Sequence, residues 1–282
     1  MLKLITLLLE QPPLVIMHGF NQHAGQMDSL VDQIKQQIPD IYIRNCEVGD
    51  GENATFYMTI ENQVNELRTC ILNDPKLANG FIAFGYSNGG MLMRGYLEHF
   101  NHLGPKILRF ITYSAPLGGF FCGRSSTCVG KAVPPILDDL VADIIYTRPL
   151  QTLIGPTNYW RDPYNLDLYI KHCAYLPKLE NIVNYSQQMK DNFLSPDLFV
   201  LFGSNKDGAI SPWQSAWFGV FADDQDEIVL SMEERDVYVQ DLFGLKTLNE
   251  NGRVKRLNTG LNHMQYDTKE FVGMLVPWLV ME

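Results

Sequence analysis

The segment FIAFGYSNGG, residues 81–90, constrains the fold of this chain more than any other stretch. An apolar run typical of a buried strand ends in G-Y-S-N-G around Ser87, and a helical pattern follows at residues 91–100. This is the G-x-S-x-G pattern of a nucleophile elbow, in the strand–turn–helix context that the pattern requires. Small residues two before and two after the serine let strand and helix pack closely around a strained turn that exposes the hydroxyl. The alternative is an ordinary tight turn.

Strand-like and helix-like segments alternate on both sides of this turn. We predict strands at residues 12–19, 41–48, 81–85, 107–114, 197–203 and 254–259. We predict helices at residues 27–40, 63–72, 91–100 and 268–280, the last with Asp267 as its N-cap. Such alternation indicates an α/β fold, with a mostly parallel central sheet and helices on both faces.

The alternation stops at residues 118–195, before the strand at 197–203. This segment contains an amphipathic helical pattern at 136–146 and several turns rich in proline and tyrosine. No change of composition and no flexible linker marks a domain boundary. We therefore expect a single domain over residues 1–282, with 118–195 as a helical and loop insertion.

His263 is the predicted general base. A serine hydroxyl becomes a good nucleophile when a base takes its proton, and in the α/β-hydrolase fold the acid and then the histidine follow the serine along the chain. Of the six histidines, only His263 lies beyond residue 200, in a loop after the strand predicted at 254–259. A surface loop histidine is the alternative interpretation.

Asp207 is the predicted acid, because it follows the strand at 197–203 by one short loop. Its role would be to hold the imidazole tautomer and to stabilise the imidazolium. Three other aspartates, Asp223, Asp224 and Asp226, lie in the charged run ADDQDE, which is more typical of a solvated surface.

Two backbone N–H groups are predicted to form an oxyanion hole. One belongs to Asn88, directly after the serine, and the other to Phe20, in the loop after the first strand. Loss of one such donor typically costs on the order of 100- to 1000-fold in rate. His18 and Gly19 would shape the same loop, and a buried structural role is the commoner one for such a histidine.

Charge and composition exclude several classes of protein. The net charge of −10 and the pI of about 5.1 argue against a nucleic-acid partner, which needs a basic surface. No stretch approaches the roughly 20 apolar residues of a transmembrane helix. The five cysteines contain no C-x-x-C pair, so we expect no zinc or other metal site. We also expect no cofactor. Lys3 followed by residues 4–9 resembles a short signal peptide; either a longer leader exists or these leucines belong to the fold.

Two further features concern covalent modification of the chain. Cys122 and Cys128 flank the segment GRSST, which forms either a small disulfide loop or two unpaired thiols. Asn53 and Asn184 begin N-x-S/T sequons and are the predicted glycosylation sites, although two sequons are close to the chance number.

The chain resembles the lysosomal palmitoyl-protein thioesterases, the second isoform more closely than the first, from about residue 12 to its end. The resemblance rests on LVIMHGF, GYSNGG, NYWRDPYNLDLYI, KDGAISPWQSAWFG and DLFGLKTL, with Asn88 where the family usually has glutamine. It implies an α/β-hydrolase, lysosomal or secreted, that cleaves fatty-acyl thioesters such as palmitoyl-CoA or S-acylated proteins. The family's nucleophile, acid and base would fall on Ser87, Asp207 and His263.

The resemblance also bears on the cysteines. Cys122 and Cys128 look like the disulfide loop of the first isoform. Cys70 matches one end of a further bridge, but the partner position is occupied by Phe100. The resemblance therefore implies that Cys70 is free or paired differently.

The insertion at 118–195 is the predicted source of an acyl-binding groove. Each buried methylene contributes about 0.8 kcal/mol, so a long acyl chain would supply roughly 10 kcal/mol of gross binding. The alternative is that its apolar residues pack the insertion onto the body of the protein. Two other functions use the same fold: a carboxylesterase or lipase acting on oxygen esters, and a lipid-binding relative without catalysis.

Overall fold

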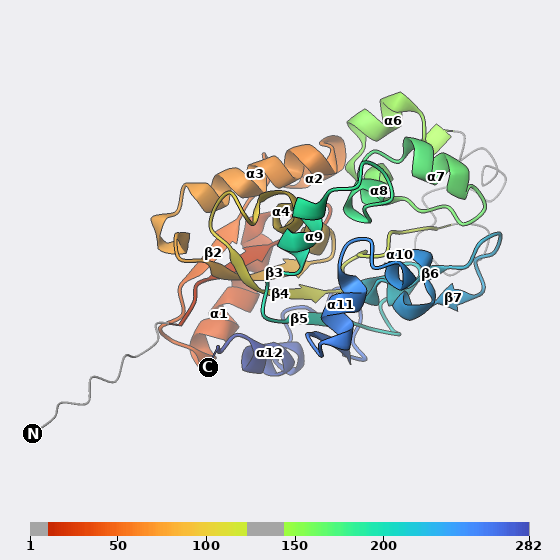
Figure 1. Ribbon diagram of the computed structural model, residues 1–282. Helices are drawn as coiled ribbons and strands as arrows, with labels where there is room; N and C mark the ends of the chain where they lie inside the picture. The colour runs from red at the N-terminus through yellow and green to blue at the C-terminus, as the bar shows by residue number, and fades with distance from the viewer. Residues whose placement is uncertain (1–10, 123–143, 282) are drawn as a thin grey trace, which may run out of the picture.

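The central sheet has six parallel strands in the order β2-β1-β3-β4-β5-β8 (Figure 1). The computed structural model describes residues 11–122 and 144–281. The strands are β1 (Leu14–Met17), β2 (Ile43–Cys46), β3 (Phe81–Tyr86), β4 (Ile107–Tyr113), β5 (Phe199–Gly203) and β8 (Val254–Asn258). Each lies within or next to a segment predicted as a strand, and the predicted α/β fold is confirmed.

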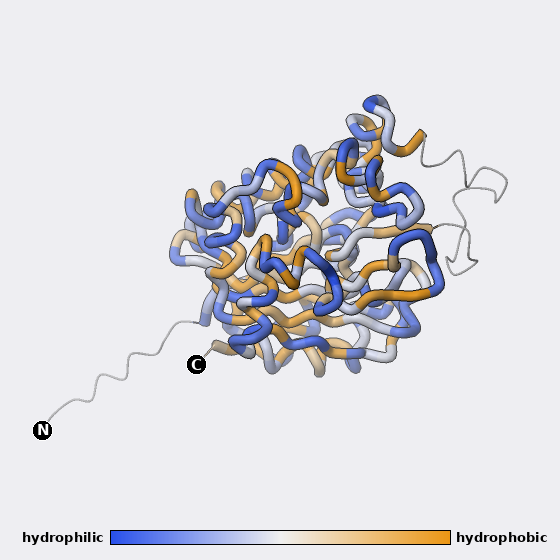
Figure 2. Tube along the Cα trace, turned by 45° about the vertical axis from the view of Figure 1, so that its right-hand side comes forward, coloured by the Kyte–Doolittle hydropathy of each residue, from blue (hydrophilic) through white to orange (hydrophobic). Residues whose placement is uncertain are grey.

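Helices cover both faces of this sheet. Successive side chains of a strand point to opposite faces, so an all-apolar strand supplies two cores. In β1, Leu14 and Ile16 join one core, whereas Val15 and Met17 join the other. The first core includes residues of α1 (Asp28–Gln37) and α12 (Lys269–Leu275), and the second includes residues of α3 (Ile60–Leu72), α4 (Asn88–Phe100) and α9 (Gln187–Phe193). Figure 2 shows the hydrophobic segments gathered along the strands in the interior.

The N-cap of α12 differs from the prediction by one residue. Thr268 is the N-cap, and its hydroxyl oxygen accepts a hydrogen bond from the Phe271 N–H, so the prediction of Asp267 was wrong. The α-helix ends at Leu275 and continues as the 3-10 turn η7 (Val276–Trp278). Pro277 lies in that turn and lacks the N–H that a longer α-helix requires.

The described part of the insertion is helical. It contains α6 (Arg148–Leu153), η4 (Gly155–Tyr159), α7 (Leu166–His172), α8 (Leu176–Leu179) and α9. In Figure 1, α6, α7 and α8 group together beyond one end of the sheet. The start of the insertion is tied to the segment after β5, because the Gly118 N–H bonds to Ser215 O and the Phe121 N–H to Ser211 O. Most of the helix predicted at 136–146 lies outside the described residues.

The remaining elements are short. They are η1 (Ala24–Met27), α2 (Glu52–Tyr57), η2 (Pro75–Leu77), η5 (Trp213–Trp217), β6 (Val220–Phe221), β7 (Val229–Leu230), η6 (Met232–Glu234), α10 (Asp236–Val239) and α11 (Leu245–Glu250). The pair β6 and β7 forms a small antiparallel sheet that the sequence analysis did not predict. Within the described ranges, no helix is both long and apolar enough for a membrane span.

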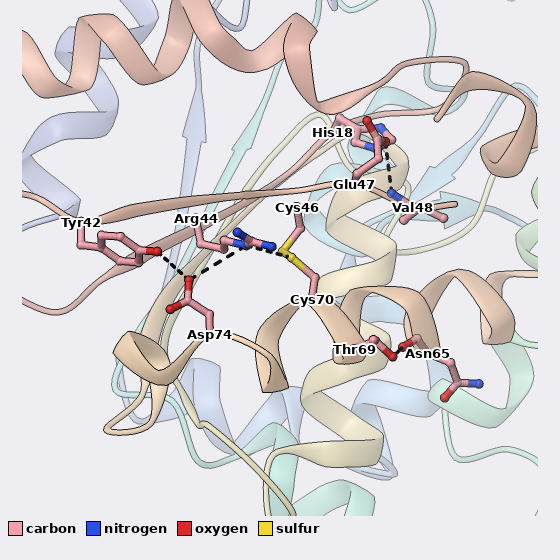
Figure 3. Close-up of a disulfide and its surroundings, with 10 residues drawn as sticks. All are labelled: His18, Tyr42, Arg44, Cys46, Glu47, Val48, Asn65, Thr69, Cys70 and Asp74. Atoms are coloured by element: carbon pink, nitrogen blue, oxygen red, sulfur yellow. Dashed lines mark hydrogen bonds and ion pairs between the residues drawn. A yellow bond between two sulfur atoms is a disulfide. The ribbon is translucent and has the colours of Figure 1, made fainter. Parts of the chain in front are cut away.

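A disulfide joins Cys46, the last residue of β2, to Cys70 in α3, with an S–S distance of 2.07 Å (Figure 3). Of the two alternatives for Cys70, a free thiol or a partner different from that in the first isoform, the second is confirmed. Cys173 is a buried free thiol. Cys122 is disulfide-bonded. Cys128 lies outside the described residues, so the pairing of Cys122 with Cys128 stays a prediction.

Candidate active site

Ser87 occupies the turn between β3 and α4. Its φ of 52° and ψ of −124° are strained for a residue that carries a side chain. Two glycines make this turn sterically possible. A Cβ on Gly89 would lie 2.2 Å from Met17 O, and a Cβ on Gly85 would lie 2.4 Å from Gly90 Cα. Any larger residue at these positions would push α4 away from the sheet, which explains the spacing of the pattern.

The three predicted triad residues lie together at the carboxyl ends of β3, β5 and β8. His263 Nε2 lies 3.1 Å from Ser87 Oγ. His263 Nδ1 lies 2.9 Å and 3.0 Å from the two carboxylate oxygens of Asp207. The backbone strengthens this pairing, because the His263 N–H donates to Asp207 O at 3.2 Å. All three residues are buried.

Asp207 is held in its ionised form. Burial alone would raise the pKa of this carboxyl, but the hydrogen bond and charge of His263 and the Ile210 N–H outweigh burial, so the pKa lies below its usual value. Its Oδ1 accepts the N–H groups of Ala209 at 2.9 Å and Ile210 at 2.7 Å. An ionised Asp207 accepts a hydrogen bond from Nδ1–H of His263, so the unprotonated Nε2 faces the serine hydroxyl.

Aromatic residues fix the loop that carries His263. The Tyr86 ring lies 5.2 Å from the imidazole and 4.3 Å from the Tyr266 ring, measured between centroids. The Tyr113 hydroxyl donates to Asn262 O at 2.8 Å. These residues were not predicted as parts of the site, because their contacts join segments far apart in the chain.

Asn88 begins α4, so its N–H has no acceptor within the helix. Its side chain is also fixed: Nδ2 donates to Gln63 Oε1 at 3.0 Å. Gln63 in turn donates to Thr55 O at 3.0 Å and Met58 O at 2.7 Å. This buried amide pair ties the start of α4 to α2 and α3. Gln63 was not predicted, since nothing in the local pattern of α3 distinguishes it.

Phe20 lies in the loop after β1, and Gly19 of this loop approaches the serine. A Cβ on Gly19 would lie 3.1 Å from Ser87 Cβ, which shows how closely this loop approaches the elbow. The N–H groups on either side of Phe20 are used: Gly19 donates to Gln22 Oε1 at 3.0 Å and Asn21 to Thr55 Oγ1 at 2.8 Å. Asn88 directly follows Ser87, and Phe20 directly follows the glycine that approaches it; the role of both N–H groups in an oxyanion hole stays a prediction.

The competing aspartates lie elsewhere. The Asp223 side chain is 71% exposed and lies 3.9 Å from Arg161. Asp226 accepts the Tyr164 hydroxyl at 3.0 Å. His263 makes its carboxylate contacts with Asp207.

The predicted glycosylation sites are accessible. Asn53, in α2, and Asn184, before α9, are both exposed. The Asn53 amide donates to Asp50 Oδ2 at 3.3 Å on the surface. Modification of either asparagine stays a prediction. Over the described residues, no cluster of three or more His, Cys, Asp or Glu side chains is placed to hold a metal ion.

Similar proteins were found at the level of sequence and of fold. The chain is similar to palmitoyl-protein thioesterase 3 of Dictyostelium discoideum, with 30% identity over 273 residues that cover 95% of this chain and 92% of the relative. It is similar to lysosomal thioesterase PPT2-B of Xenopus laevis, with 30% identity over 276 residues (95% and 92%). Palmitoyl-protein thioesterase 1 of Caenorhabditis elegans is 29% identical over 278 residues (95% and 91%). Relatives named after the first and the second isoform thus match with nearly equal identity.

Among solved structures, the monoacylglycerol lipase of Paleococcus ferrophilus aligns with a TM-score of 0.51 at 14% identity, covering 95% of each chain. That likeness shows a shared α/β-hydrolase fold. The sequence profile of the family described as palmitoyl protein thioesterase matches residues 13–263. The chain therefore belongs to the palmitoyl protein thioesterase family.

Proposed function

We propose that this chain is a serine hydrolase that cleaves fatty-acyl thioesters, such as palmitoyl-CoA or an S-acylated protein, through an acyl-serine intermediate. The observation that carries the proposal is the 3.1 Å contact between Ser87 Oγ and His263 Nε2, on an elbow that strains the serine. Membership of a thioesterase family supports the choice of substrate.

In the first half-reaction, His263 Nε2 takes the hydroxyl proton of Ser87 while Oγ attacks the acyl carbon. The carbonyl oxygen becomes an oxyanion, and the N–H groups of Phe20 and Asn88 donate to it. When the carbon–sulfur bond breaks, the imidazolium returns its proton to the departing sulfur. The acyl group remains on Ser87.

In the second half-reaction, water replaces the thiol. His263 takes a proton from the water as its oxygen attacks the acyl-serine carbon. The ester bond breaks, the proton passes to Ser87 Oγ, and the free fatty acid leaves. Asp207 keeps its negative charge throughout and stabilises the imidazolium in both halves.

A thioester suits this site, because a thiol with a pKa near about 8.5 leaves as a thiolate more easily than an alcohol leaves as an alkoxide. Proton donation by the imidazolium is therefore less demanding than in the cleavage of an oxygen ester. The insertion at 118–195 is our proposed source of the acyl-binding region. Its described part contacts the segment after Asp207 through Gly118 and Phe121.

We also propose that the protein works in the lysosome or after secretion. Several relatives are named lysosomal thioesterases. The Cys46–Cys70 disulfide supports an oxidising route of synthesis.

The test compares hydrolysis of palmitoyl-CoA with that of a matched palmitoyl oxygen ester, by the wild type and by Ser87→Ala. We expect the thioester to be preferred in kcat/KM and Ser87→Ala to lose both activities. A preference for the oxygen ester would favour a carboxylesterase or lipase. Equal rates for wild type and Ser87→Ala would remove the proposed mechanism.

A further inference from the structure

We propose that Glu47 is a positioning residue for the oxyanion loop, which we define as residues 18–24. One carboxylate holds both ends of this loop and thereby sets the position of the Phe20 N–H beside Ser87. The inference rests on the proposed function, because it assigns Glu47 a part in that same reaction.

Strand register brings Glu47 to the loop. In the parallel pairing of β1 with β2, Met17 is opposite Cys46. The next residues, His18 and Glu47, leave the sheet side by side, as Figure 3 shows. The Cys46–Cys70 disulfide anchors the chain one residue before Glu47 to α3.

At its first end, the oxyanion loop is held through His18. This residue is fully buried, and its Nε2 lies 2.7 Å from Glu47 Oε1. Burial lowers the pKa of His18, and the nearby Glu47 carboxylate opposes that shift, so this is a close contact between a carboxylate and a buried imidazole. The His18 carbonyl lies against the elbow, where a Cβ on Gly89 would come within 2.5 Å of it. Glu47 therefore contacts the residue that connects this end of the loop to the elbow.

At its second end, the loop is held through Ala24. The Ala24 N–H donates to Glu47 Oε2 at 2.7 Å, and Asn45 Nδ2 donates to Ala24 O at 2.7 Å. The carboxylate is itself fixed, because Oε1 accepts the Val48 N–H at 3.1 Å. Both carboxylate oxygens are thus occupied, one at each end of the loop.

The part of the loop between these two ends carries the predicted oxyanion donor, so its position matters for the rate. Residues 19–23 contain Phe20 and Asn21, and Asn21 has a φ of 54°. An oxyanion donor stabilises the transition state only when it points at the developing charge, so a small displacement of the loop lowers the rate. The Glu47 side chain is 39% exposed, so it keeps part of its hydration while it accepts these bonds.

Glu47→Gln tests the inference directly. The glutamine keeps the size of the side chain but has one carbonyl oxygen, so it accepts a hydrogen bond at one end of the loop only. For palmitoyl-CoA we expect kcat to fall by about 10- to 100-fold with KM changed less than about twofold, because the loss is confined to the transition state. The rate at which a fluorophosphonate labels Ser87 should fall by about tenfold, since the phosphonyl oxygen uses the same donors.

Glu52→Gln is the matched control. It removes the same charge from an exposed position in the nearby helix α2 and should leave kcat and the labelling rate at wild-type values. Thermal unfolding of all variants shows whether the fold is retained.

Ala24→Pro removes the second contact without touching the carboxylate. Proline is tolerated at the first position of a helical turn, and His23 before it is already extended, with a φ of −133° and ψ of 163°. We expect Ala24→Pro to lower kcat in the same direction as Glu47→Gln. The double variant should lose less than the product of the two single losses, because both act through one contact.

The outcomes separate this inference from the proposed function. Wild-type kcat and labelling in Glu47→Gln, multiplicative losses in the double variant, or a loss confined to KM would each overturn the role of Glu47. If the wild type is labelled at Ser87 but does not hydrolyse palmitoyl-CoA, the substrate assignment fails while the labelling rates still decide the role of Glu47. A wild type that is not labelled at Ser87 removes both.

Discussion

Asp207 keeps a negative charge in a buried position because its neighbours donate to it. The pKa of this carboxyl is lowered below its usual value although burial opposes the shift. Its contribution to stability is present above the pKa of the unfolded chain and is lost as the pH falls through the lower folded value. Asp207 therefore stays ionised down to a pH below the ordinary range of an aspartate.

Asp207→Asn tests this charge. The amide fills the same space but favours the wrong imidazole tautomer, so we expect kcat to fall by about 10³- to 10⁴-fold with the fold intact. Steady-state hydrolysis of palmitoyl-CoA measures the loss. Asp223→Asn makes the same change at an exposed position and should be neutral; similar rates for the two variants would contradict the role of Asp207.

Glu98 is a second buried carboxyl with the opposite behaviour. It lies in α4, where its Oε1 accepts Arg94 Nε at 2.7 Å, and its Oε2 is buried with no hydrogen-bond partner among the described residues. Burial raises the pKa from 4.5 to about 7 despite the nearby guanidinium. The native state therefore binds a proton at Glu98 more tightly than the unfolded chain does.

The sign of this linkage predicts that the contribution of Glu98 to stability is larger in acid. The contribution of Glu98 is fully present below about pH 4.5 and is lost as the pH rises through about 7. In the wild type, the loss of this contribution lowers the thermal midpoint as the pH rises from about 4.5 to about 7. In Glu98→Gln the midpoint should fall less over the same pH range. Midpoints measured across that range provide the test, with the exposed Glu66→Gln as control. Parallel curves for Glu98→Gln and the wild type would show that Glu98 does not titrate there.

At the scale of elements, the disulfide links β2 to α3 across a sequence separation of 24 residues. Closing a loop of this length in the unfolded chain is worth about 3 kcal/mol of stability. We expect Cys70→Ser to lower the free energy of unfolding by about that amount, as measured by denaturant titration without reductant. A reductant should then destabilise the wild type more than Cys70→Ser. Equal unfolding of the two oxidised proteins would contradict this prediction.

The elements themselves follow closely from local sequence. The four inner strands β1, β3, β4 and β5 are short, mainly apolar runs, whereas the edge strands β2 and β8 contain polar residues. Leu30 and Ile34 of α1, and Val64, Leu67 and Ile71 of α3, recur at helical spacing on the buried faces. The N-cap of α12 was missed because Asp267 and Thr268 are both good caps, and only the backbone decides which hydroxyl or carboxylate reaches the helix N–H groups. The sheet β6–β7 was missed because each strand has only two residues.

At the scale of the whole molecule, the candidate site was predictable where chain order implied it. Ser87 was predicted from the glycines around it, and Asp207 and His263 were predicted from their positions after late strands. The contacts that support the site were not predictable, because Glu47, Gln63 and Tyr113 reach it from distant segments through the packing of the fold. The pairing of Cys46 with Cys70 likewise depends on where β2 and α3 meet, which spacing does not reveal.

The central claim is that Ser87 is the nucleophile of one triad with His263 and Asp207. The most direct measurement is site mapping by mass spectrometry after reaction with a fluorophosphonate, in parallel with hydrolysis of palmitoyl-CoA. The account predicts one label per chain, on Ser87, with loss of turnover in proportion to labelling and no label in Ser87→Ala. Turnover that persists in the fully labelled protein, or a label on another residue that abolishes turnover, would contradict it.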